Sequence, residues 1–589
     1  MGFTGMNTAV SGLNAAQAGL YVTGHNMANS SVAGYSRQRP VTTDFTYQNI
    51  GESPIGKKQK GLGVMLKALQ QIRDRFLDAS YRAENCRLGF YEIKAVTGQE
   101  IESIMGETQS QYNFQQVLDD VWNSLNELAS HPEGVETRTN FLAHCTTFIT
   151  KAEDVYARLF AHQHNLDDQI RAATAKINSL VSEIDTLNRK ISSVEYTGDH
   201  ANDYRDQRAA CLDELSKIIN YEFKEKDDSG IMLVCEGKEL LNNGFIHKVG
   251  LKYTNVEYSF IEPVFTDDPG ILPADTPLSE YEPLFVFTDT VNAENDNDTG
   301  SLKGMLISRG TRPANYLGTA AYEQPDPTDL VTFPLGVNDP LYASRLRRYN
   351  NDVYSVNNCF VPQVMNMIDA IVHRVVTLIN DSIAPALPNG AQDPSGPYPL
   401  NPNDDAAGIQ RSYTEVFSRK FINRWDAANT LNPEQPYEYY TQYTMGNLQI
   451  NPDVMLNGGY NLLAFSPAQG DASIGAGFGD RGDNRLLLDI ISKWNERIVR
   501  LNSAESYSVN DAYKRFIASI GDETSEDLSF VQEQNLLVRQ SDDRRNQIMG
   551  VSLDEEMKNM MIYQHAYSAA ARMLNVMDSM MQEVIRIAG

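Results

Sequence analysis

The sequence predicts a mainly α-helical protein with β-rich insertions, in which segments from both ends of the chain build one discontinuous coiled-coil or helical rod. Three observations predict this fold class. One long stripe of apolar residues keeps heptad spacing, the two ends of the chain carry matching amphipathic helices, and the middle changes to short apolar runs between turn residues. The 589 residues allow about four domains.

Changes of sequence texture indicate where these parts begin and end. The predicted parts are a terminal helical domain (1–50 with 551–589), a rod of long helices (51–220 with 345–385 and 446–550), a β-rich inserted domain (221–344) and a second insertion (386–445). The second insertion is rich in Pro, Asn and Tyr and is too long for an ordinary loop.

The first element is an amphipathic helix. Its apolar residues recur at steps of three, four and seven, and Gln17 and Gly24 complete the same face: Met6, Val10, Leu13, Leu20 and Met27. A polar, glycine-containing stretch follows at residues 25–39. Such a composition lets a helix end and the chain turn.

The clearest periodic signal lies between residues 166 and 194. Steps of four and three, with Ala173 included, place one seam against a partner: Leu166, Ile170, Ile177, Leu180, Ile184, Leu187, Ile191 and Val194. At 1.5 Å rise per residue the seam spans about 40 Å, which favours an elongated coiled coil over a globular bundle. A similar stripe from Leu346 to Leu378 could supply the partner helix, with a bend at Pro362.

The last helix repeats the character of the first. Its apolar stripe again has steps of three and four: Tyr567, Ala570, Leu574, Met577, Met581, Val584 and Ala588. In "SLDEE", Ser552 and Glu555 predict a capping box at its start. Neither terminal helix is stable alone, so each needs a partner, most economically the other terminus of the same or a neighbouring chain.

Composition excludes several classes of function. With 50 Lys and Arg against 77 Asp and Glu, the net charge of −27 repels nucleic acid and anionic membrane surfaces. We expect no membrane anchor and no cleaved signal peptide, because no run of about 18 apolar residues and no basic start followed by an apolar run is present. The five cysteines are scattered and are expected to be small buried hydrophobes.

No motif supports catalysis. "GFGDRG" at 477–482 has no strand directly before it, and the acidic run 294–300 lacks the carboxylate that a calcium loop needs. His162 and His164 point to different faces of a helix and are expected at the surface. Asn202 or Asp203 is interpreted as a helix cap, with Asp206 and Arg208 as exposed helix charges. We therefore expect no enzyme activity, no cofactor and no metal.

The two ends resemble the terminal signatures of the bacterial flagellar axial proteins, the family of rod, hook and hook-associated subunits. The opening "SGLNAAQAGLYVTGHNMANSSVAGYSRQR" and the ending "GVSLDEEMKNMMIYQHAYSAAARMLNVMDSMMQEVI" carry this resemblance. "GYSRQR" and the interior "INSLVSEIDTLNRKI" and "NDYRDQRAACLDELS" are most similar to the hook-associated members that join hook and filament. The family's turn usually reads Asn-Thr-Pro-Gly-Tyr, whereas this chain has Ser31, Val32 and Ala33 before Gly34.

The resemblance implies a structural adaptor rather than an enzyme. In this family the terminal helices pack together as an inner tube layer, and the bend after the first helix leads to the next layer. The resemblance adds Leu553 and Met557 to the residues expected to pack between subunits. The hinge residues that it implies are Asn26, Asn29, Gly34, Tyr35 and Arg37.

It also implies partners and a location. Expected partners are further copies in a ring, the hook protein, a second junction protein leading to the flagellin filament, and a cytoplasmic export chaperone at the C-terminal helix. Such subunits leave through the flagellar type III apparatus and act outside the cell at the hook–filament junction. Two alternatives stay open: another hook or rod subunit, or an axial-type carrier whose insertions act as an adhesin or enzyme.

Overall fold

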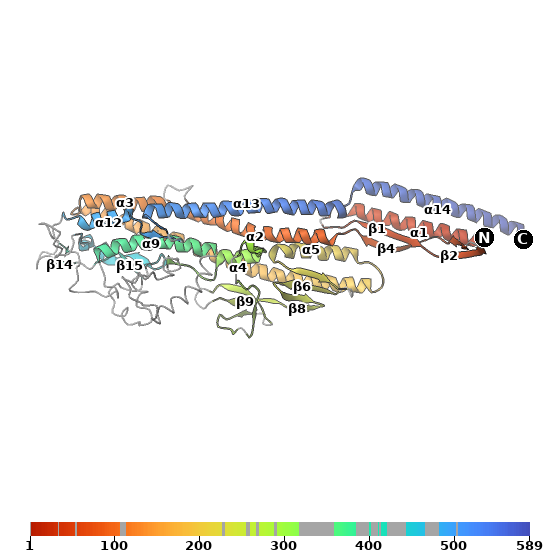
Figure 1. Ribbon diagram of the computed structural model, residues 1–589, viewed down its shortest axis with the longest axis horizontal. Coiled ribbons are helices and arrows are strands. Elements are labelled where there is room, and N and C mark those ends of the chain that lie inside the picture. The colour runs from red at the N-terminus through yellow and green to blue at the C-terminus, as the bar shows by residue number, and fades with distance from the viewer. Residues whose placement is uncertain are drawn as a thin grey trace.

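The computed structural model is an elongated rod of long helices with both chain ends at one tip (Figure 1). Long helices dominate and the sheets are small, which confirms the predicted fold class. The structure describes residues 2–32, 34–53, 56–106, 113–226, 230–254, 259–266, 270–277, 279–287, 291–316, 359–384, 400–401, 410–411, 414–420, 443–465, 482–501 and 505–588. In this part of the chain no helix is long and apolar enough to cross a membrane.

The tip is formed by the first and last helices, α1 (Gly2–Ala28) and α14 (Leu553–Ala588), which lie side by side (Figure 1). The cap at Ser552 is confirmed, since its hydroxyl accepts the Glu555 N–H at 3.4 Å. The predicted return bond from the Glu555 side chain is wrong. That carboxylate takes the Arg37 guanidinium at 2.5 Å instead, because a cation is a stronger partner than a backbone N–H.

A two-stranded ribbon connects α1 to the rod. Strand β1 (Gln38–Asp44) pairs antiparallel with β4 (Val64–Gln71) against α1, and β2 (Tyr47–Ser53) pairs with β3 (Gly56–Gly61). The first rod helix therefore begins at Arg75, after this ribbon. Local periodicity missed these strands because each one depends on a partner strand elsewhere in the chain.

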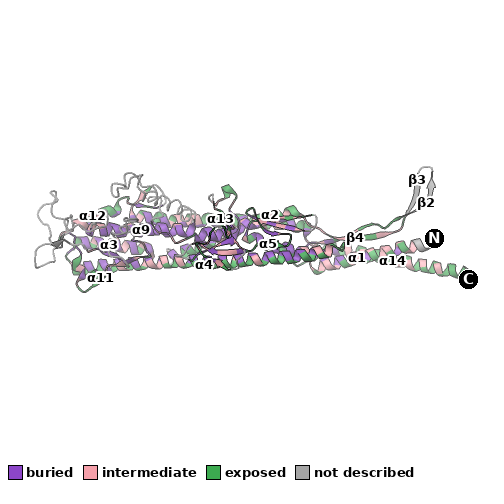
Figure 2. Cartoon of the chain, turned by 90° about the horizontal axis from the view of Figure 1, so that it is seen from below, coloured by how far each residue is buried: buried purple, intermediate pink, exposed green. Residues whose placement is uncertain are grey.

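The rod contains three long helices, α2 (Arg75–Met105), α4 (Val135–Glu195) and α13 (Val509–Met549). Helices α3 (Phe114–Ser130), α9 (Phe360–Ile383) and α12 (Arg485–Asn495) complete its far end around a large apolar core. Figure 2 shows the result: buried residues fill the rod, whereas α14 at the tip is mostly exposed.

The heptad seam lies on α4. Its residues from Leu166 to Ile191 are buried except for Ala173, which is half-buried, as is Val194. Most of the seam packs on α5 (Asn202–Ile218), α6 (Ser301–Arg309) and neighbouring strands, in a core cluster separate from that of α9. The expected partner stripe from Leu346 to Leu378 is thus wrong, because spacing identifies a buried face but not the element that covers it.

The bend expected at Pro362 is also wrong. Helix α9 begins at Phe360, so Pro362 lies in its first turn, where its missing N–H breaks no helical hydrogen bond. The part of the stripe before residue 359 lies outside the described residues.

Two four-stranded sheets cover α4 and α5 where β texture was predicted. Strands β5 (Glu222–Glu225), β6 (Ile231–Cys235), β7 (Lys238–Asn242) and β8 (Phe245–Ile246) pair in sequence order. The second sheet has the order β11-β9-β10-β12, with β9 (Val249–Tyr253), β10 (Ile261–Phe265), β11 (Ile271–Leu272) and β12 (Glu282–Pro283). A short 3₁₀ helix, η1 (Ala293–Asn295), precedes α6.

The remaining elements are short and flank the core of the far end. They are β13 (Leu400–Asn401), β14 (Gln410–Arg411), β15 (Phe417–Arg419), β16 (Leu448–Ile450), α11 (Pro452–Met455), η5 (Gly459–Leu462), β17 (Val499–Arg500) and β18 (Ser506–Tyr507). Most of the second insertion, and most of the "GFGDRG" motif, lies outside the described residues.

Candidate assembly surface and its joint

Helix α1 meets α14 through small residues. They recur at steps of four and three along one face: Gly5, Ala9, Gly12, Ala16 and Gly19. A Cβ at residue 19 would stand 2.5 Å from the Tyr563 ring, and one at residue 5 would collide with the Met577 side chain. The absence of large side chains on this face lets the two helix backbones approach closely.

The larger apolar residues of α1 flank this contact. Met6, Leu13, Leu20 and Met27 are half-buried, and Val10 is 39% exposed. The sequence reasoning followed large apolar side chains and missed the small-residue face, although the spacing of its glycines and alanines was visible. The large side chains of the predicted stripe are therefore only partly covered by the helix pair.

The predicted stripe of α14 divides into two sets. Leu574, Met577 and Met581 are half-buried and lie on the side of the helix that carries Tyr563 and Ala570, the residues beside the α1 glycines. The other predicted residues are exposed: Leu553, Met557, Tyr567 and Val584. One set closes the helix pair, and the other leaves apolar side chains exposed.

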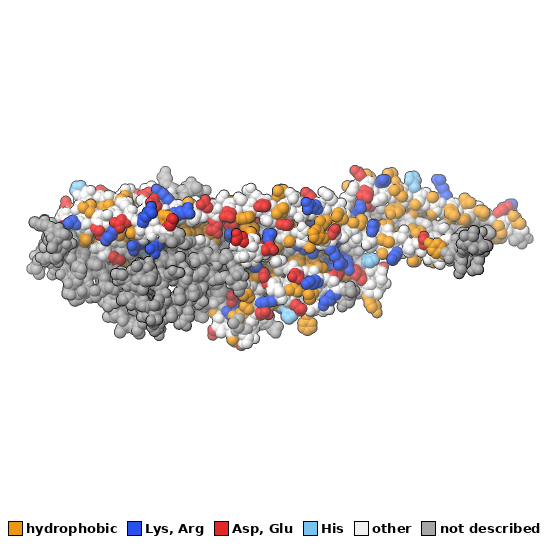
Figure 3. Space-filling model, in the orientation of Figure 1, with side chains coloured by type: hydrophobic (Ala, Val, Ile, Leu, Met, Phe, Trp, Pro, Cys, Tyr) orange, Lys and Arg blue, Asp and Glu red, His pale blue; other side chains and the backbone are white. Residues whose placement is uncertain are grey.

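The apolar side chains of α14 that α1 leaves exposed form a surface along the whole helix. We call it the outer face of α14 and define it by the side chains that are at least 39% exposed: Leu553, Met557, Met561, Ile562, Tyr567, Met573, Val576, Met580, Val584, Ile585 and Ile587. Figure 3 shows apolar side chains gathered over α14. Contiguous exposed apolar surface of this kind marks an interaction site.

All five predicted hinge residues lie together at the bend after α1. Gly34 has a φ of 79°, the left-handed conformation that glycine adopts without strain. The buried Asn26 amide donates to the Gln38 carbonyl at 2.9 Å, and its oxygen accepts the Gln38 N–H at 3.0 Å and the Tyr35 hydroxyl at 2.9 Å. Asn26 thus fixes the direction in which β1 leaves α1.

The bend is also tied to α1 and to α13. The Asn29 amide donates to the His25 carbonyl at 3.0 Å, which satisfies an acceptor at the end of α1. The Arg37 N–H donates to the Met549 carbonyl at 2.8 Å, at the end of α13. Burial and the carboxylates around it raise the pKa of Tyr35, so its hydroxyl remains a hydrogen-bond donor at neutral pH.

Asp206 of α5 binds Ser36, directly after the bend. Its carboxylate accepts the Ser36 N–H at 3.1 Å and the Ser36 hydroxyl at 2.8 Å, and it also accepts from Gln71 at 2.6 Å and Arg73 at 3.1 Å. The prediction of Asp206 and Arg208 as exposed charges is wrong, since they are 8% and 4% exposed. Ser36 lies 170 residues away in sequence, so no local spacing could reveal it.

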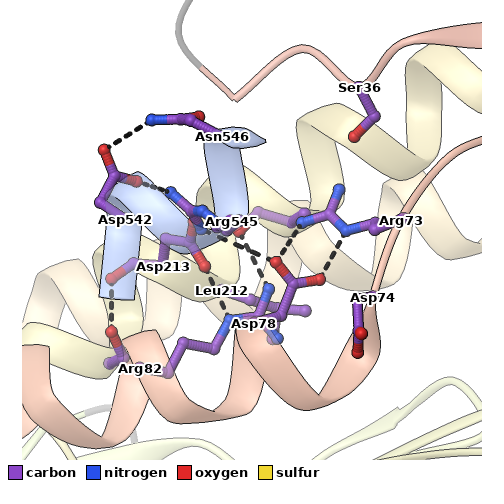
Figure 4. A network of polar contacts seen from close by, with 12 residues as sticks. Ser36, Arg73, Asp74, Asp78, Arg82, Leu212, Asp213, Asp542, Arg545 and Asn546 are labelled. Carbon is purple, nitrogen blue, oxygen red and sulfur yellow. Dashed lines mark hydrogen bonds and ion pairs between the residues drawn. The ribbon is translucent and has the colours of Figure 1, made fainter. Parts of the chain in front are cut away.

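Further charge pairs near Asp206 join helices α2, α5 and α13 (Figure 4). Arg73 pairs with Asp78 at 2.6 Å, and Arg545 of α13 pairs with Asp213 of α5 at 2.6 Å. Asp213 also accepts from Arg82 of α2 at 2.7 Å. We call the contacts of Ser36, Asp206 and these pairs the polar joint. It ties the base of the terminal helix pair to α2, α5 and α13.

A cavity of about 570 Å³ beside the joint is lined by five arginines: Arg73, Arg75, Arg82, Arg205 and Arg208. Each of these arginines is paired with a carboxylate, and Glu225 alone accepts from three of them. The charges of the cavity are therefore compensated within the chain, and we assign no ligand to it.

The structure also places the histidines and cysteines that the sequence analysis considered. His162 is buried on α4, which corrects the expected surface position, and burial lowers its pKa, while His164 is exposed. All five cysteines are buried, as predicted, and burial raises the pKa of each thiol. Among the described residues no group of His, Cys, Asp or Glu could hold a metal ion.

Comparison with known proteins agrees with this architecture. Residues 98–317 match the family "Flagellar hook-associated protein FlgK helical domain", and residues 546–587 match "Flagellar basal body rod FlgEFG protein C-terminal". The chain is 26% identical to flagellar hook-associated protein 1 of Bacillus subtilis, over all of this chain and 98% of that protein. It is 24% identical to the protein of that name from Salmonella typhimurium, over 99% of both.

A solved structure shares the fold. The flagellar hook junction protein FlgK from Burkholderia pseudomallei superposes with a TM-score of 0.50 at 10% identity, over 80% of this chain and all of that one. Fold and matches together define a structural subunit of the bacterial flagellum and not an enzyme.

Within that class, the chain is similar to flagellar hook-associated protein 1 over nearly its whole length. The resemblance of its two ends to axial proteins is confirmed. The alternatives of a hook or rod subunit, or of a carrier for an adhesin or enzyme, are not favoured.

Proposed function

We propose that this chain is the structural adaptor that joins hook to filament, by packing its terminal helix pair against neighbouring subunits. The observation that carries the proposal is the outer face of α14, which the rest of the described chain leaves uncovered. Full burial of one such side chain is worth about 1.5–3 kcal/mol, so even partial burial along the helix drives association. The terminal pair thus gains its main stabilisation from neighbours rather than from its own chain.

The family supports a specific set of neighbours. We propose a ring of copies of this chain, with the hook protein on one side and a second junction protein leading to the flagellin filament on the other. The unassembled subunit exposes the same apolar helix, so we propose that a cytoplasmic export chaperone holds it there. Export through the flagellar type III apparatus without signal cleavage then places the subunit outside the cell.

The division of labour along the chain is part of this proposal. The terminal parts, 1–50 and 551–589, act as the inner layer that meets neighbours. The rod, formed by 51–220, 345–385 and 446–550, acts as the layer outside it, and the insertions at 221–344 and 386–445 lie further out. The polar joint carries the orientation of the inner layer relative to the rod.

The first experiment is deletion of this gene in the source organism, with electron microscopy of the cells and a blot for flagellin in the medium. Hooks without filaments, together with shed flagellin, are the expected result. Normal filaments on the deletion strain would contradict the adaptor role.

Point variants separate the two sides of α14. We expect Val576→Asp with Val584→Asp to keep the α1–α14 pair but to block incorporation, since both side chains belong to the outer face, at 59% and 63% exposure. Leu574→Asp with Met577→Asp should open the pair itself and also block incorporation while the rod stays folded. Leu488→Asp, 50% exposed on α12 at the other end of the rod, is the matched control and should assemble normally. Normal junctions in both α14 variants would refute the assignment.

A further inference from the structure

Methionines are concentrated in α14. The chain has 19 methionines, and α14 holds seven of them within 36 residues: Met557, Met560, Met561, Met573, Met577, Met580 and Met581. Four of the seven belong to the outer face, with exposed fractions of 49% for Met557, 57% for Met561, 45% for Met573 and 63% for Met580. The most accessible thioethers of the described chain are therefore gathered mainly on one helix.

The methionines of the rod core have the opposite environment. They are at most 8% exposed: Met105, Met305, Met365, Met367, Met445 and Met549. Outside α14, the exposed methionines of the described chain are Met65 in β4 and Met455 in α11, at 44% and 55%. The chain thus contains matched exposed and buried thioethers for comparison.

The four exposed methionines remain accessible while α1 and α14 are paired. At about 100° per residue, Tyr563, Ala570 and Met577 share the side that packs on the α1 glycines. Met557 and Met561 lie on the opposite half of the helix, whereas Met573 and Met580 lie four residues before and three residues after Met577, beside the contact. All four side chains are at least 45% exposed, so they are accessible without separation of α1 from α14.

We propose that Met557, Met561, Met573 and Met580 are the oxidation site of the unassembled subunit, and that their conversion to sulfoxide blocks assembly. The oxidant is hydrogen peroxide. The thioether sulfur attacks one peroxide oxygen, the O–O bond breaks, and sulfur keeps that oxygen as a sulfoxide while the other leaves as water. Sulfur loses two electrons, and the peroxide gains them.

The consequence follows from the polarity of the product. A sulfoxide converts a flexible apolar side chain into a polar one, and burying a polar group without a hydrogen bond costs about 1–3 kcal/mol in proteins. The inference rests on the proposed function, because only burial of this helix by neighbours makes the change harmful. Four such groups on one face should raise the subunit concentration needed for half-maximal assembly at least about tenfold, since tenfold corresponds to about 1.4 kcal/mol.

The first test is chemical. The full-length purified subunit is treated with hydrogen peroxide, and oxidation at each methionine is followed by peptide mass spectrometry. We expect the four outer methionines, Met65 and Met455 to be oxidised well before the core methionines. Equal rates at Met561 and at the buried Met365 would overturn the proposed site.

The second test is functional. Hooks isolated from the deletion strain are incubated with untreated or oxidised subunit, and bound subunit is measured by sedimentation. A variant with Leu at all four positions serves as the control, because Leu has a similar volume and is not oxidised. Met455→Leu is the matched single variant and should remain sensitive to peroxide.

The outcomes are distinct. Loss of binding after oxidation in the natural chain, retention in the four-Leu variant, and recovery after enzymatic sulfoxide reduction would support the proposal. Undiminished binding of fully oxidised subunit would overturn it and leave the adaptor role intact. Failure of the untreated subunit to bind hooks would count against the adaptor role itself, and with it the inference that rests on it.

Discussion

Gly19 of α1 lies against the ring of Tyr563 of α14, so closely that a Cβ on residue 19 would stand 2.5 Å from two ring carbons. An aromatic ring is rigid, and it cannot yield as a flexible side chain would. The close approach of the two terminal helices at this position thus depends on the absence of a side chain at residue 19. This relationship gives a direct test of whether the pair exists in the free subunit.

Gly19→Ala should weaken the helix pair, although Ala favours an isolated helix over Gly by about 0.5–1 kcal/mol. Overpacking against Tyr563 costs about 1–3 kcal/mol and outweighs that gain. Hydrogen exchange of the amides of α1 and α14 measures the effect. Gly24→Ala is the matched control, since a Cβ at residue 24 meets nothing within 4 Å, and it should slow exchange in α1. Faster exchange in both variants would mean that the contact with Tyr563 is not the cause.

Asp206→Asn should loosen the polar joint. The amide removes the charge that faces Arg73, and its NH₂ group cannot accept from the Ser36 N–H or hydroxyl. We expect a loss of about 1–3 kcal/mol in the local free energy of unfolding around residues 36–38, measured by hydrogen exchange. Asp203→Asn changes a side chain that is 62% exposed and should have a small effect. Equal effects of the two variants would contradict the role of Asp206.

Asp369 and His373, one turn apart and buried on α9, should give opposite pH dependences. Asp369 accepts the N–H groups of Tyr316 at 2.9 Å and Met445 at 2.7 Å, and the His373 ring donates to the Tyr443 carbonyl at 3.1 Å. Burial raises the pKa of Asp369 from 3.8 to about 7 and lowers the pKa of His373 from 6.5 to about 3.

The slope of stability against pH has opposite signs for the two groups. As the pH rises from about 4 to about 7, unfolded Asp369 releases a proton that the folded chain keeps, so stability falls. As the pH falls from 6.5 to about 3, His373 gains a proton in the unfolded chain but not in the folded chain, so stability falls with falling pH. Between about pH 4 and 6.5 the two slopes oppose each other.

Single variants expose each slope. Over this window the stability of α9 should fall with rising pH in His373→Gln, where only the Asp369 slope remains. It should rise with rising pH in Asp369→Asn, where only the His373 slope remains. Each change is roughly 3 kcal/mol at most, at 1.36 kcal/mol per pH unit. Hydrogen exchange of α9 amides across the window is the measurement, with the natural chain as the reference. Slopes of the same sign in both variants would contradict the assignment.

Ile184→Ala should damage the α4 seam more than a change at the end of the seam. Ile184 is fully buried, and truncation of a buried Ile to Ala costs about 2–5 kcal/mol. Val194→Ala, at the half-buried last position of the seam, should cost about 1 kcal/mol. Thermal unfolding with exchange of α5 amides would show the difference. Equal costs would mean that the seam continues to Val194 with undiminished packing.

The sequence could predict those parts of the candidate site that depend on residues close together in the chain. The hinge residues Asn26 and Gly34 are implied by the resemblance of residues 11–39 to the axial-protein signature, and the positive φ of Gly34 fits a glycine at that position. The polar joint could not be found, since Asp206 meets Ser36 across 170 residues and Arg545 meets Asp213 across 332. The spacing of "NDYRDQR" instead predicted exposed charges there.

The sequence by itself determined which faces are apolar. Periodicity is a property of one helix or strand, so the stripe of α4, the two apolar terminal helices and the β texture of the middle could all be inferred from residue order. Only the tertiary structure decided what covers each face. It placed α5 and the strands on the seam, the α1 glycines against Tyr563, and nothing of the described chain on the outer face of α14. The physical reason is that burial is non-directional: apolar spacing requires a partner, but only packing in three dimensions chooses one.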